Sequence, residues 1–310
     1  MNALSIDVEE WFHLCRSERF VPASSWGRLE SRVEAGTRAV LRILAEHNVR
    51  ATFFILGYVA ERHPNLVREI ARAGHEIGTH GYWHRRLDDQ SPEEFEEDLR
   101  SSIELLTAIS GREIRCYRAP EWSMSRSTSW AYEILARNGI RYDSSVLPLK
   151  REEERLPGSI PTGHGVVREF PLSTRSLRVV NIPFSNGTAV RLLPLSAIAA
   201  SIRRSNRAGI PVNLSLHSWD GDAGFPHIVL PLVRGFLHYL NRNTAHRKLR
   251  ALLATFPFGT IATAVNRFLE SPPPRGSSGR PFDNGRRGRR SCDGKPDPSP
   301  LLPTGSPCGR

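Results

Sequence analysis

The pair His80 and His84 is the first feature of this sequence that could do chemistry, because the two histidines lie four residues apart. In a helical turn both imidazole rings would project from one face and could share a metal ion. A histidine pair with this spacing is, by itself, more often structural. Asp7 and Glu9 change that balance, because residues two apart in a strand point the same way and either carboxylate could reach the ion. One carboxylate and two imidazoles leave coordination positions open for water, as a catalytic zinc site requires.

Three further ionisable residues follow short apolar runs: Arg118, Asp143 and His217. Pro120 and Trp122 beside Arg118 predict a partly apolar wall that holds the guanidinium against a carboxylate, rather than an exposed surface ion pair. Asp143 precedes two serines and could instead cap a turn. His217, taken alone, is more often a buried core residue than a catalyst. Together with the acids and histidines above, however, these residues are typical of an active site.

Tryptophans lie inside three of these motifs, at Trp83, Trp122 and Trp219. Core packing is the commoner role of such side chains. An indole beside a catalytic group is also suited to stacking on a sugar ring, because it offers a large rigid apolar face. The sequence leaves both roles open.

The segments between these motifs alternate between strand and helix patterns over residues 1–268. Ser91-Pro92-Glu93-Glu94 predicts a helix start, with an N-cap serine and proline at the first helical position. A less regular stretch follows Ser144. The alternation favours parallel strands joined by right-handed crossovers, so polar residues at the strand ends should meet at one rim. Strands are predicted at 3–7, 51–56, 75–79, 114–117, 140–144 and 212–216, and helices ending near 48 and 74, at 92–110 and near 127–138 and 195–205.

The composition is that of a soluble globular protein: 39% of the 310 residues are hydrophobic and 24% are charged. Four scattered cysteines form no C-x-x-C pair and predict neither a zinc knuckle nor a disulfide framework. The sequence contains no apolar run long enough for a membrane span, and the N-terminus has no secretory signal pattern. We therefore expect the protein in the cytoplasm or at the inner face of the membrane.

The formal net charge is +11, and much of the positive charge lies in a C-terminal tail, residues 269–310. Positions 271–310 hold seven Arg and one Lys against three Asp, in a background rich in Pro, Gly and Ser. A segment with so few aliphatic residues cannot offset the entropy of ordering, which predicts a disordered basic tail rather than a packed unit. The charge therefore does not indicate a nucleic-acid-binding domain.

The order of the motifs resembles the NodB-homology polysaccharide deacetylases, carbohydrate esterase family four. An acidic motif, H-x-x-x-H, R-A-P-x-W, Y-D-S and L-H follow one another as they do in that family. The segments Asp7–His13, Ala51–Phe54 and Leu216–Trp219 are similar to the branch found beside exosortase (PEP-CTERM) exopolysaccharide loci. The resemblance covers residues 1–268 and implies an α/β fold, a distorted (β/α) barrel of about seven parallel strands.

The resemblance also implies the metal site and the base. The cofactor would be a divalent ion, Zn²⁺ first among them, with three ligands: Glu9, His80 and His84. Asp7 would be the catalytic base, positioned by Arg118. Val8 stands between the two acids where most relatives have adjacent aspartates, so Glu9 is the ligand by inference.

The acid side of the reaction is implied in the same way. His217 would be the general acid, oriented by Asp143, and Leu216 would line the pocket for the acetyl methyl group. A backbone N–H near Ala119 would help to stabilise the oxyanion. The exosortase branch usually has Pro and Glu where this sequence has Ser218 and Asp220. The residues implied in substrate binding are Ala119, Trp122, Leu216 and Trp219.

The sequence therefore predicts a metal-dependent hydrolase that removes N-acetyl groups from an N-acetylated polysaccharide, or from its lipid-linked precursor, and releases acetate. Its partner would be the glycan, with peripheral contact to a lipid-linked form, and neither nucleic acid nor a transmembrane segment would be involved. Two alternatives stay open. One is a metal amidase acting on a small N-acyl or cyclic-amide substrate, and the other is a non-catalytic glycan-binding protein of the same fold. Acetate release from an N-acetylglucosamine oligomer would separate them.

Overall fold

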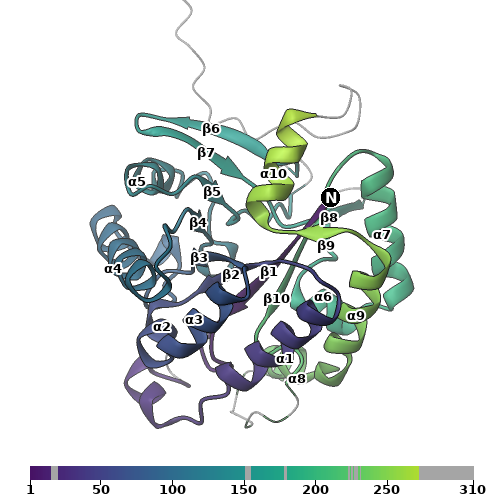
Figure 1. Ribbon diagram of the computed structural model, residues 1–310, viewed down its shortest axis with the longest axis horizontal. Coiled ribbons are helices and arrows are strands. Elements are labelled where there is room, and N and C mark those ends of the chain that lie inside the picture. The colour runs from purple at the N-terminus through teal and green to yellow at the C-terminus, as the bar shows by residue number, and fades with distance from the viewer. Residues whose placement is uncertain are drawn as a thin grey trace, which may run out of the picture.

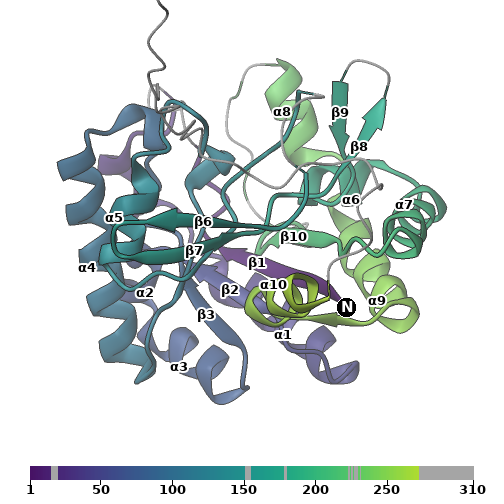
Figure 2. The ribbon, with the colours of Figure 1, turned by 90° about the horizontal axis from the view of Figure 1, so that it is seen from above.

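A computed structural model describes residues 1–14, 20–150, 155–177, 180–222, 224, 226, 230 and 232–271. Over these residues the chain forms one nine-stranded sheet and a separate two-stranded ribbon. The large sheet is curled into a half-barrel with helices on its outside (Figures 1 and 2).

The strands of the large sheet are short, and the central ones are buried. β1 (Asn2–Val8) is buried along its whole length and pairs parallel with β10 (Asn213–His217) and β2 (Thr52–Ile55). The others are β3 (Glu76–Thr79), β4 (Cys116–Tyr117), β5 (Tyr142–Asp143), β6 (Gly158–Thr162), β7 (Gly165–Glu169) and β11 (Phe258–Gly259). The order is β10-β1-β2-β3-β4-β5-β7-β6, with β11 beside β1. Neighbours from β10 to β7 run parallel and β6 is antiparallel, which confirms the predicted barrel of parallel strands in an incompletely closed form.

The register of the strands brings their carboxyl ends to one rim. Asp7 is the register partner of His217 on β10 and of Phe54 on β2. Thr79 at the end of β3 is likewise level with Tyr117 at the end of β4. The residues that follow these strands therefore emerge side by side, as the sequence pattern predicted.

Helices pack on the outside of the curved sheet (Figures 1 and 2). α4 (Pro92–Ser110) begins with a reciprocal capping box between Ser91 and Glu94 and ends at Gly111, whose φ of 68° suits glycine. The sequence predicted both ends of this helix. The remaining helices are α1 (Val33–Glu46), α2 (Gly57–Arg62), α3 (Pro64–Arg72), α5 (Ala131–Arg137), α6 (Gly187–Leu192), α7 (Leu195–Arg207), α8 (Leu232–Tyr239), α9 (Ala245–Thr255) and α10 (Ile261–Glu270).

The stretch after Ser144 that the sequence pattern left irregular is regular in the structure. It holds the hairpin β6–β7, the ribbon of β8 (Thr174–Leu177) and β9 (Val180–Pro183), and α6. The pattern was weak because β8 is mostly exposed and β6 is an edge strand, so neither carries a continuous buried run.

Polar side chains close the open side of the half-barrel below the rim. Asn213 on β10 donates to the Ser144 hydroxyl at 2.9 Å and to the Phe170 carbonyl at 3.0 Å. The Ser215 N–H donates to the Ser185 carbonyl at 2.8 Å. These buried hydrogen bonds tie β10 to residues that follow β5, β7 and β9, so side-chain and backbone groups link the segments where strand pairing stops.

The C-terminal part of the described chain returns to the central strand. α10 packs Ile261, Ala264 and Val265 into a small apolar cluster with Ala3 and Phe54. Among the described residues, no helix is both long and apolar enough to cross a membrane. The predicted tail beyond residue 271 lies outside the described residues, so the domain boundary at 268 stays a prediction.

Candidate active site

A cavity of about 170 Å³ opens at the carboxyl ends of the strands. All predicted site residues line it except Asp143 and Leu216. A larger hollow of about 500 Å³ lies around Arg50, Glu76 and Arg112. Within the described part of the chain, the one group of three His, Cys, Asp or Glu side chains arranged to hold a metal ion belongs to the smaller cavity. The chemistry therefore concentrates there.

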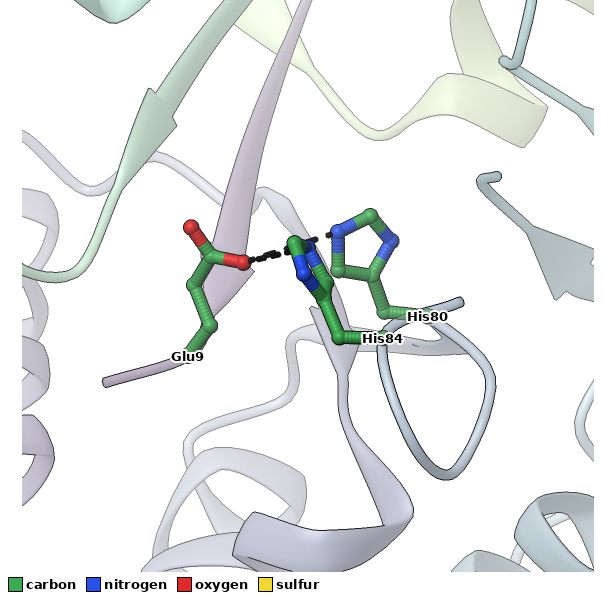
Figure 3. Close-up of side chains that lie close together, drawn as sticks. All are labelled: Glu9, His80 and His84. Carbon is green, nitrogen blue, oxygen red and sulfur yellow. Dashed lines mark ion pairs between the residues drawn. The ribbon is translucent and has the colours of Figure 1, made fainter. Parts of the chain in front are cut away.

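Glu9, His80 and His84 form that group, and their ligand atoms all lie within 4.8 Å of one another (Figure 3). Nε2 of His84 is 2.8 Å and Nε2 of His80 is 3.9 Å from the same Glu9 oxygen, Oε2. All three side chains are buried. Two imidazole nitrogens and one carboxylate oxygen form a donor set suited to zinc with open positions left for other ligands.

The protonation states fit a metal site. Burial alone would raise the pKa of Glu9, but the neighbouring His84, His217 and His80 hold it below its ordinary value, so the carboxylate is charged. Burial lowers the pKa of His80 to about 4, so its ring is neutral at pH 7. Nδ1–H of His80 donates to the Arg118 carbonyl at 2.8 Å, which leaves the lone pair on Nε2 facing Glu9.

A loop, not a helical turn, brings the two histidines together. Gly81 has a φ of 75° and His84 a φ of 57°, both in the left-handed region. The Tyr82 and Trp83 N–H groups donate to the two carboxylate oxygens of Asp98 on α4, at 2.7 and 3.1 Å. A Cβ on Gly81 would lie 2.8 Å from Asp98 Oδ2. Asp98 therefore shapes the loop that presents both histidines.

Asp7 lies beside the metal group and is held by Arg118, as predicted. The guanidinium donates to Asp7 Oδ1 at 2.7 Å and to the Ser215 hydroxyl at 2.8 Å. It also donates to the Ser144 carbonyl at 3.0 Å. Because Arg118 is buried and fixed on several sides, it holds one oxygen of Asp7 and leaves the other directed away from it.

His217 lines the same cavity from the end of β10, the strand beside β1. Its Nδ1–H donates to Asp220 Oδ2 at 3.0 Å, and its ring stacks on Trp219 with centroids 4.5 Å apart. Nε2 lies 3.7 Å from Glu9 Oε1. Burial alone would lower the pKa of His217, but the charge and hydrogen bond of Asp220, with Glu9 and Asp7, raise it to about 9. The ring is thus protonated at pH 7 before any cation binds.

The predicted orientation of His217 by Asp143 is wrong. Asp143 accepts a short hydrogen bond from the Ser145 hydroxyl and lies beside Glu169 on β7. Burial and the nearby Asp143 raise the pKa of Glu169 well above its ordinary range, so these two acids form a separate buried pair. The carboxylate that contacts His217 is the local one, Asp220, whose Oδ2 accepts the Nδ1–H of the ring.

The structure also bears on the residues predicted to bind substrate. Leu216 is 2% exposed and packs in the core, because the alternation of β10 turns Ser215 and His217 inward and Leu216 outward. The Ala119 N–H donates to the Ser145 hydroxyl at 2.8 Å, so it is engaged within the protein. Trp219 stacks on His217, and its indole N–H donates to Glu9 Oε1 at 3.1 Å; it also lines the cavity, so its substrate contact stays a prediction. Trp122 lines the cavity, and its substrate contact stays a prediction.

Sequence reasoning missed several residues of this site. Asp220 carries the strongest signal, because an acid three residues after a histidine at a strand end can fold back in a turn. His13 lines the cavity as a buried neutral ring, since burial lowers its pKa to about 3. Arg191 on α6 forms a buried ion pair with Asp220 Oδ1 at 2.9 Å, and no local pattern in the sequence indicates it.

Two family models match consecutive parts of this chain. Residues 28–142 match the family described as polysaccharide deacetylase, and residues 144–266 match a domain of unknown function, DUF3473. Residues 28–142 belong to the polysaccharide deacetylase family. In the structure this deacetylase segment contains His80, His84 and Arg118, whereas His217 and Asp220 lie in the DUF3473 segment.

Known relatives of this chain include a peptidoglycan deacetylase of Helicobacter pylori, 32% identical over 114 residues, which are 37% of this chain and 38% of that protein. A peptidoglycan-N-acetylglucosamine deacetylase of Bacillus cereus is 37% identical over 172 residues, covering 47% of this chain and 62% of that protein. A chitooligosaccharide deacetylase of Azorhizobium caulinodans is 41% identical over 90 residues, 28% of this chain and 43% of that protein. The match thus spans less than two thirds of each of these relatives.

Solved structures bear on the fold. A crystal structure from Mycobacterium smegmatis, of a protein assigned to the polysaccharide deacetylases, superposes with a TM-score of 0.57 at 23% identity, over 90% of this chain and 93% of that one. The Puue allantoinase structure superposes with a TM-score of 0.56 at 14% identity, over 88% and 91% of the two chains. Similarity at this identity shows a shared fold across nearly the whole described chain, including the DUF3473 segment.

Proposed function

We propose that this protein is a metal-dependent N-deacetylase acting on an N-acetylated glycan. The observation that carries the proposal is the convergence of three groups on one cavity: the Glu9-His80-His84 set, the Asp7–Arg118 pair, and His217. A metal site between a candidate base and a candidate acid is what hydrolysis of an amide requires, because an amide is a poor electrophile with a poor leaving group.

Glu9, His80 and His84 would hold the ion, and Zn²⁺ fits their donor set. When bound, such an ion supplies Lewis-acid chemistry, lowering the pKa of water and polarising a carbonyl. Asp7, fixed through Oδ1 on Arg118, would accept a proton from the attacking water through its other oxygen. Two hydrogen bonds would keep the ligands in place: the Trp219 indole N–H donates to Glu9, and Nδ1–H of His80 donates to the Arg118 carbonyl.

His217 would act as the general acid. As the carbon–nitrogen bond of the acetamide breaks, its Nε2 proton would pass to the departing sugar amine, leaving a free amine and acetate. The raised pKa of His217 favours the protonated form that this donation needs, and Asp220 stabilises that form. In this proposal Asp220 replaces Asp143 as the partner of the acid.

The substrate class rests on the family and on the names of the relatives, which act on peptidoglycan or chitooligosaccharides. We therefore propose a glycan that carries N-acetylated amino sugars. The lipid-linked precursor, the link to exopolysaccharide biosynthesis and the cytoplasmic location stay predictions of the sequence.

The test is acetate release from N-acetylglucosamine oligomers by the purified full chain, with added Zn²⁺ and after removal of metal by a chelator. We expect activity with the ion, loss on chelation and recovery on readdition. Activity confined to small N-acyl or cyclic amides would support the amidase alternative instead. Binding of oligomers without acetate release, in metal-loaded protein, would support a glycan-binding role.

A further inference from the structure

We infer that the DUF3473 segment is the acid half of the active site, and that Arg191 is the residue that positions the acid by holding Asp220 against His217. This inference rests on the proposed function, because it gives His217 its role in amide cleavage. It gives a function to residues 144–266, which match a domain described as having unknown function.

The two segments matched by the family models contribute different residues to the cavity. Two proposed ligands and Arg118 lie in residues 28–142, but nothing in that range faces the cavity from the β10 side. β10 lies in the second segment and pairs in parallel with β1, which sets His217 level with Asp7. The second segment is therefore not a separate appended domain. It completes the sheet that the first segment leaves open.

Asp220 connects His217 to the body of the second segment. Its Oδ2 accepts the backbone N–H of His217 at 2.7 Å and the Nδ1–H of the same residue at 3.0 Å. Both bonds come from one residue, so they fix the rotation of the imidazole as well as its tautomer. Nε2 is then the nitrogen that carries the transferable proton toward the cavity.

Arg191 holds the other oxygen of the same carboxylate. Its Nε lies 2.9 Å from Asp220 Oδ1, and its Nη1 donates to the His238 carbonyl at 2.8 Å. The Arg191 and Asp220 side chains are each only 2% exposed, so neither charge has water to stabilise it. A buried ion pair of this kind is costly to break, because the remaining partner is left as an uncompensated charge. Removing Arg191 should therefore release Asp220 from its place beside His217.

The start of α6 is adapted to this carboxylate. A Cβ placed on Gly187 would lie 1.8 Å from Asp220 Oδ2, closer than any side chain can approach. The helix that carries Arg191 can therefore reach Asp220 only because residue 187 is glycine. Two independent features of α6, a glycine and a buried arginine, point to the same carboxylate.

The chemistry of this assignment separates two kinds of substrate. Cleavage of an acetamide needs a proton on the departing amine, which His217 would supply. Cleavage of 4-nitrophenyl acetate does not, because nitrophenolate leaves without protonation. A residue that positions the acid should therefore matter for the amide and not for the aryl ester, whereas a residue that only stabilises the fold should affect both reactions alike.

The experiment compares full-length Arg191→Met, Arg191→Lys and Asp220→Asn with wild type and with Arg204→Met, an exposed arginine on α7 as the matched control. We expect Arg191→Met to lower kcat for N-acetylglucosamine oligomers by about 10–100-fold, by analogy with the loss found when groups that orient metal-bound imidazoles are removed. Zinc content, KM and 4-nitrophenyl acetate hydrolysis should stay near wild type. Arg191→Lys should recover part of the amide rate, and Arg204→Met should match wild type.

Equal losses on amide and ester, loss of zinc from Arg191→Met, or no loss at all would overturn the inference. A second measurement does not depend on turnover: the Nδ1 proton of His217, identified by NMR through its absence in His217→Ala, should give a low-field signal in wild type. We expect Arg191→Met and Asp220→Asn to shift or remove this signal and Arg204→Met to keep it. If wild type releases no acetate, the proposed function fails, and an unchanged signal in Arg191→Met separately rejects the positioning role.

Discussion

The two sides of the cavity use the same pair of residue types in different ways. On one side Arg118 holds Asp7 at 2.7 Å, and on the other Arg191 holds Asp220 at 2.9 Å, with all four side chains buried. Asp7 lines the cavity itself, whereas Asp220 contacts His217, and His217 lines the cavity. A buried arginine–carboxylate pair can therefore present either a carboxylate or an imidazole to a substrate. The difference lies in the carboxylate oxygen that the arginine does not hold: in Asp220 this oxygen accepts a hydrogen bond from His217.

The origin of the two sides in the chain also differs. The side of the proposed base combines β1 with the deacetylase segment, over a distance of 111 residues between Asp7 and Arg118. The side of the proposed acid is built within the DUF3473 segment, from residues that the turn after β10 and helix α6 bring together. Mutations that affect metal binding, the proposed base and the proposed acid one at a time therefore test whether the two sides differ in this way.

The largest effect is expected from the metal ligands. Glu9→Gln and His84→Ala should lose bound zinc and lower acetate release to the uncatalysed background, because a lost ligand removes the ion that both sides of the cavity serve. Elemental analysis of the purified variants and an acetate assay check this. Glu30→Gln, at an exposed position, is the control. One full equivalent of zinc in Glu9→Gln would exclude Glu9 as a ligand.

The second largest loss of activity is expected from replacing the proposed base, Asp7. Asp7→Asn should keep zinc but lower acetate release by about 10²–10⁴-fold, since it removes the group that accepts the proton of water. The loss should appear with the amide and with 4-nitrophenyl acetate, because both reactions need the water activated. His217→Ala should be equally severe with the amide but mild with the ester. Loss of zinc from Asp7→Asn, with zinc retained in Glu9→Gln, would exchange the roles of the two acids.

A smaller effect is expected at the loop that carries the histidines. Asp98→Asn keeps the shape of the side chain but replaces one of the two oxygens that accept the Tyr82 and Trp83 N–H groups. We expect about 10–100-fold weaker zinc binding, as for other groups that hold metal ligands in place, with activity restored by excess zinc. Titration of zinc-free protein measures it, and the exposed Asp88→Asn is the control. Unchanged affinity would show that the loop keeps its shape without Asp98.

Asp143 should contribute less, and differently from Asp220. Asp143→Asn should change the amide rate by less than about tenfold, because a neutral amide can still accept the Ser145 hydroxyl bond and Asp143 lies apart from His217. The ratio of amide to ester rates should stay at its wild-type value. A selective loss of amide cleavage would return Asp143 to the role of partner for the acid.

The smallest effect is expected from the basic tail. Its composition predicts no packing against the barrel, so a chain ending at Ser271 should keep its melting temperature and its rate of acetate release. Thermal unfolding and the oligomer assay compare the two lengths. A large loss of either would show that residues 272–310 dock on the domain or help to bind substrate.

Much of this site followed from the sequence because strand ends are local features. His80, Arg118 and His217 each come directly after or at the end of a short apolar run, and parallel strands deliver such residues to one rim. The two-residue spacing of Asp7 and Glu9 likewise placed both acids at the cavity. The order of these motifs was enough to expect the fold and the chemistry.

The tertiary structure alone decided which side chains meet. Asp143 and Asp220 are both acids near the rim, and only the side-chain contacts of the folded chain show that Asp220 reaches His217 while Asp143 pairs with Glu169. Leu216 packs in the core because successive residues of β10 point to opposite faces, so the strand that turns His217 toward the cavity turns Leu216 away from it.

Arg191 is the clearest case of a residue that sequence reasoning could not find. It lies in a short helix of a stretch without strong periodicity, and its partner Asp220 is 29 positions further along the chain. Types and spacing of residues determine what is available at a strand end, since strand geometry is local. Orientation and pairing depend on contacts between distant segments, and those exist only once the chain is packed.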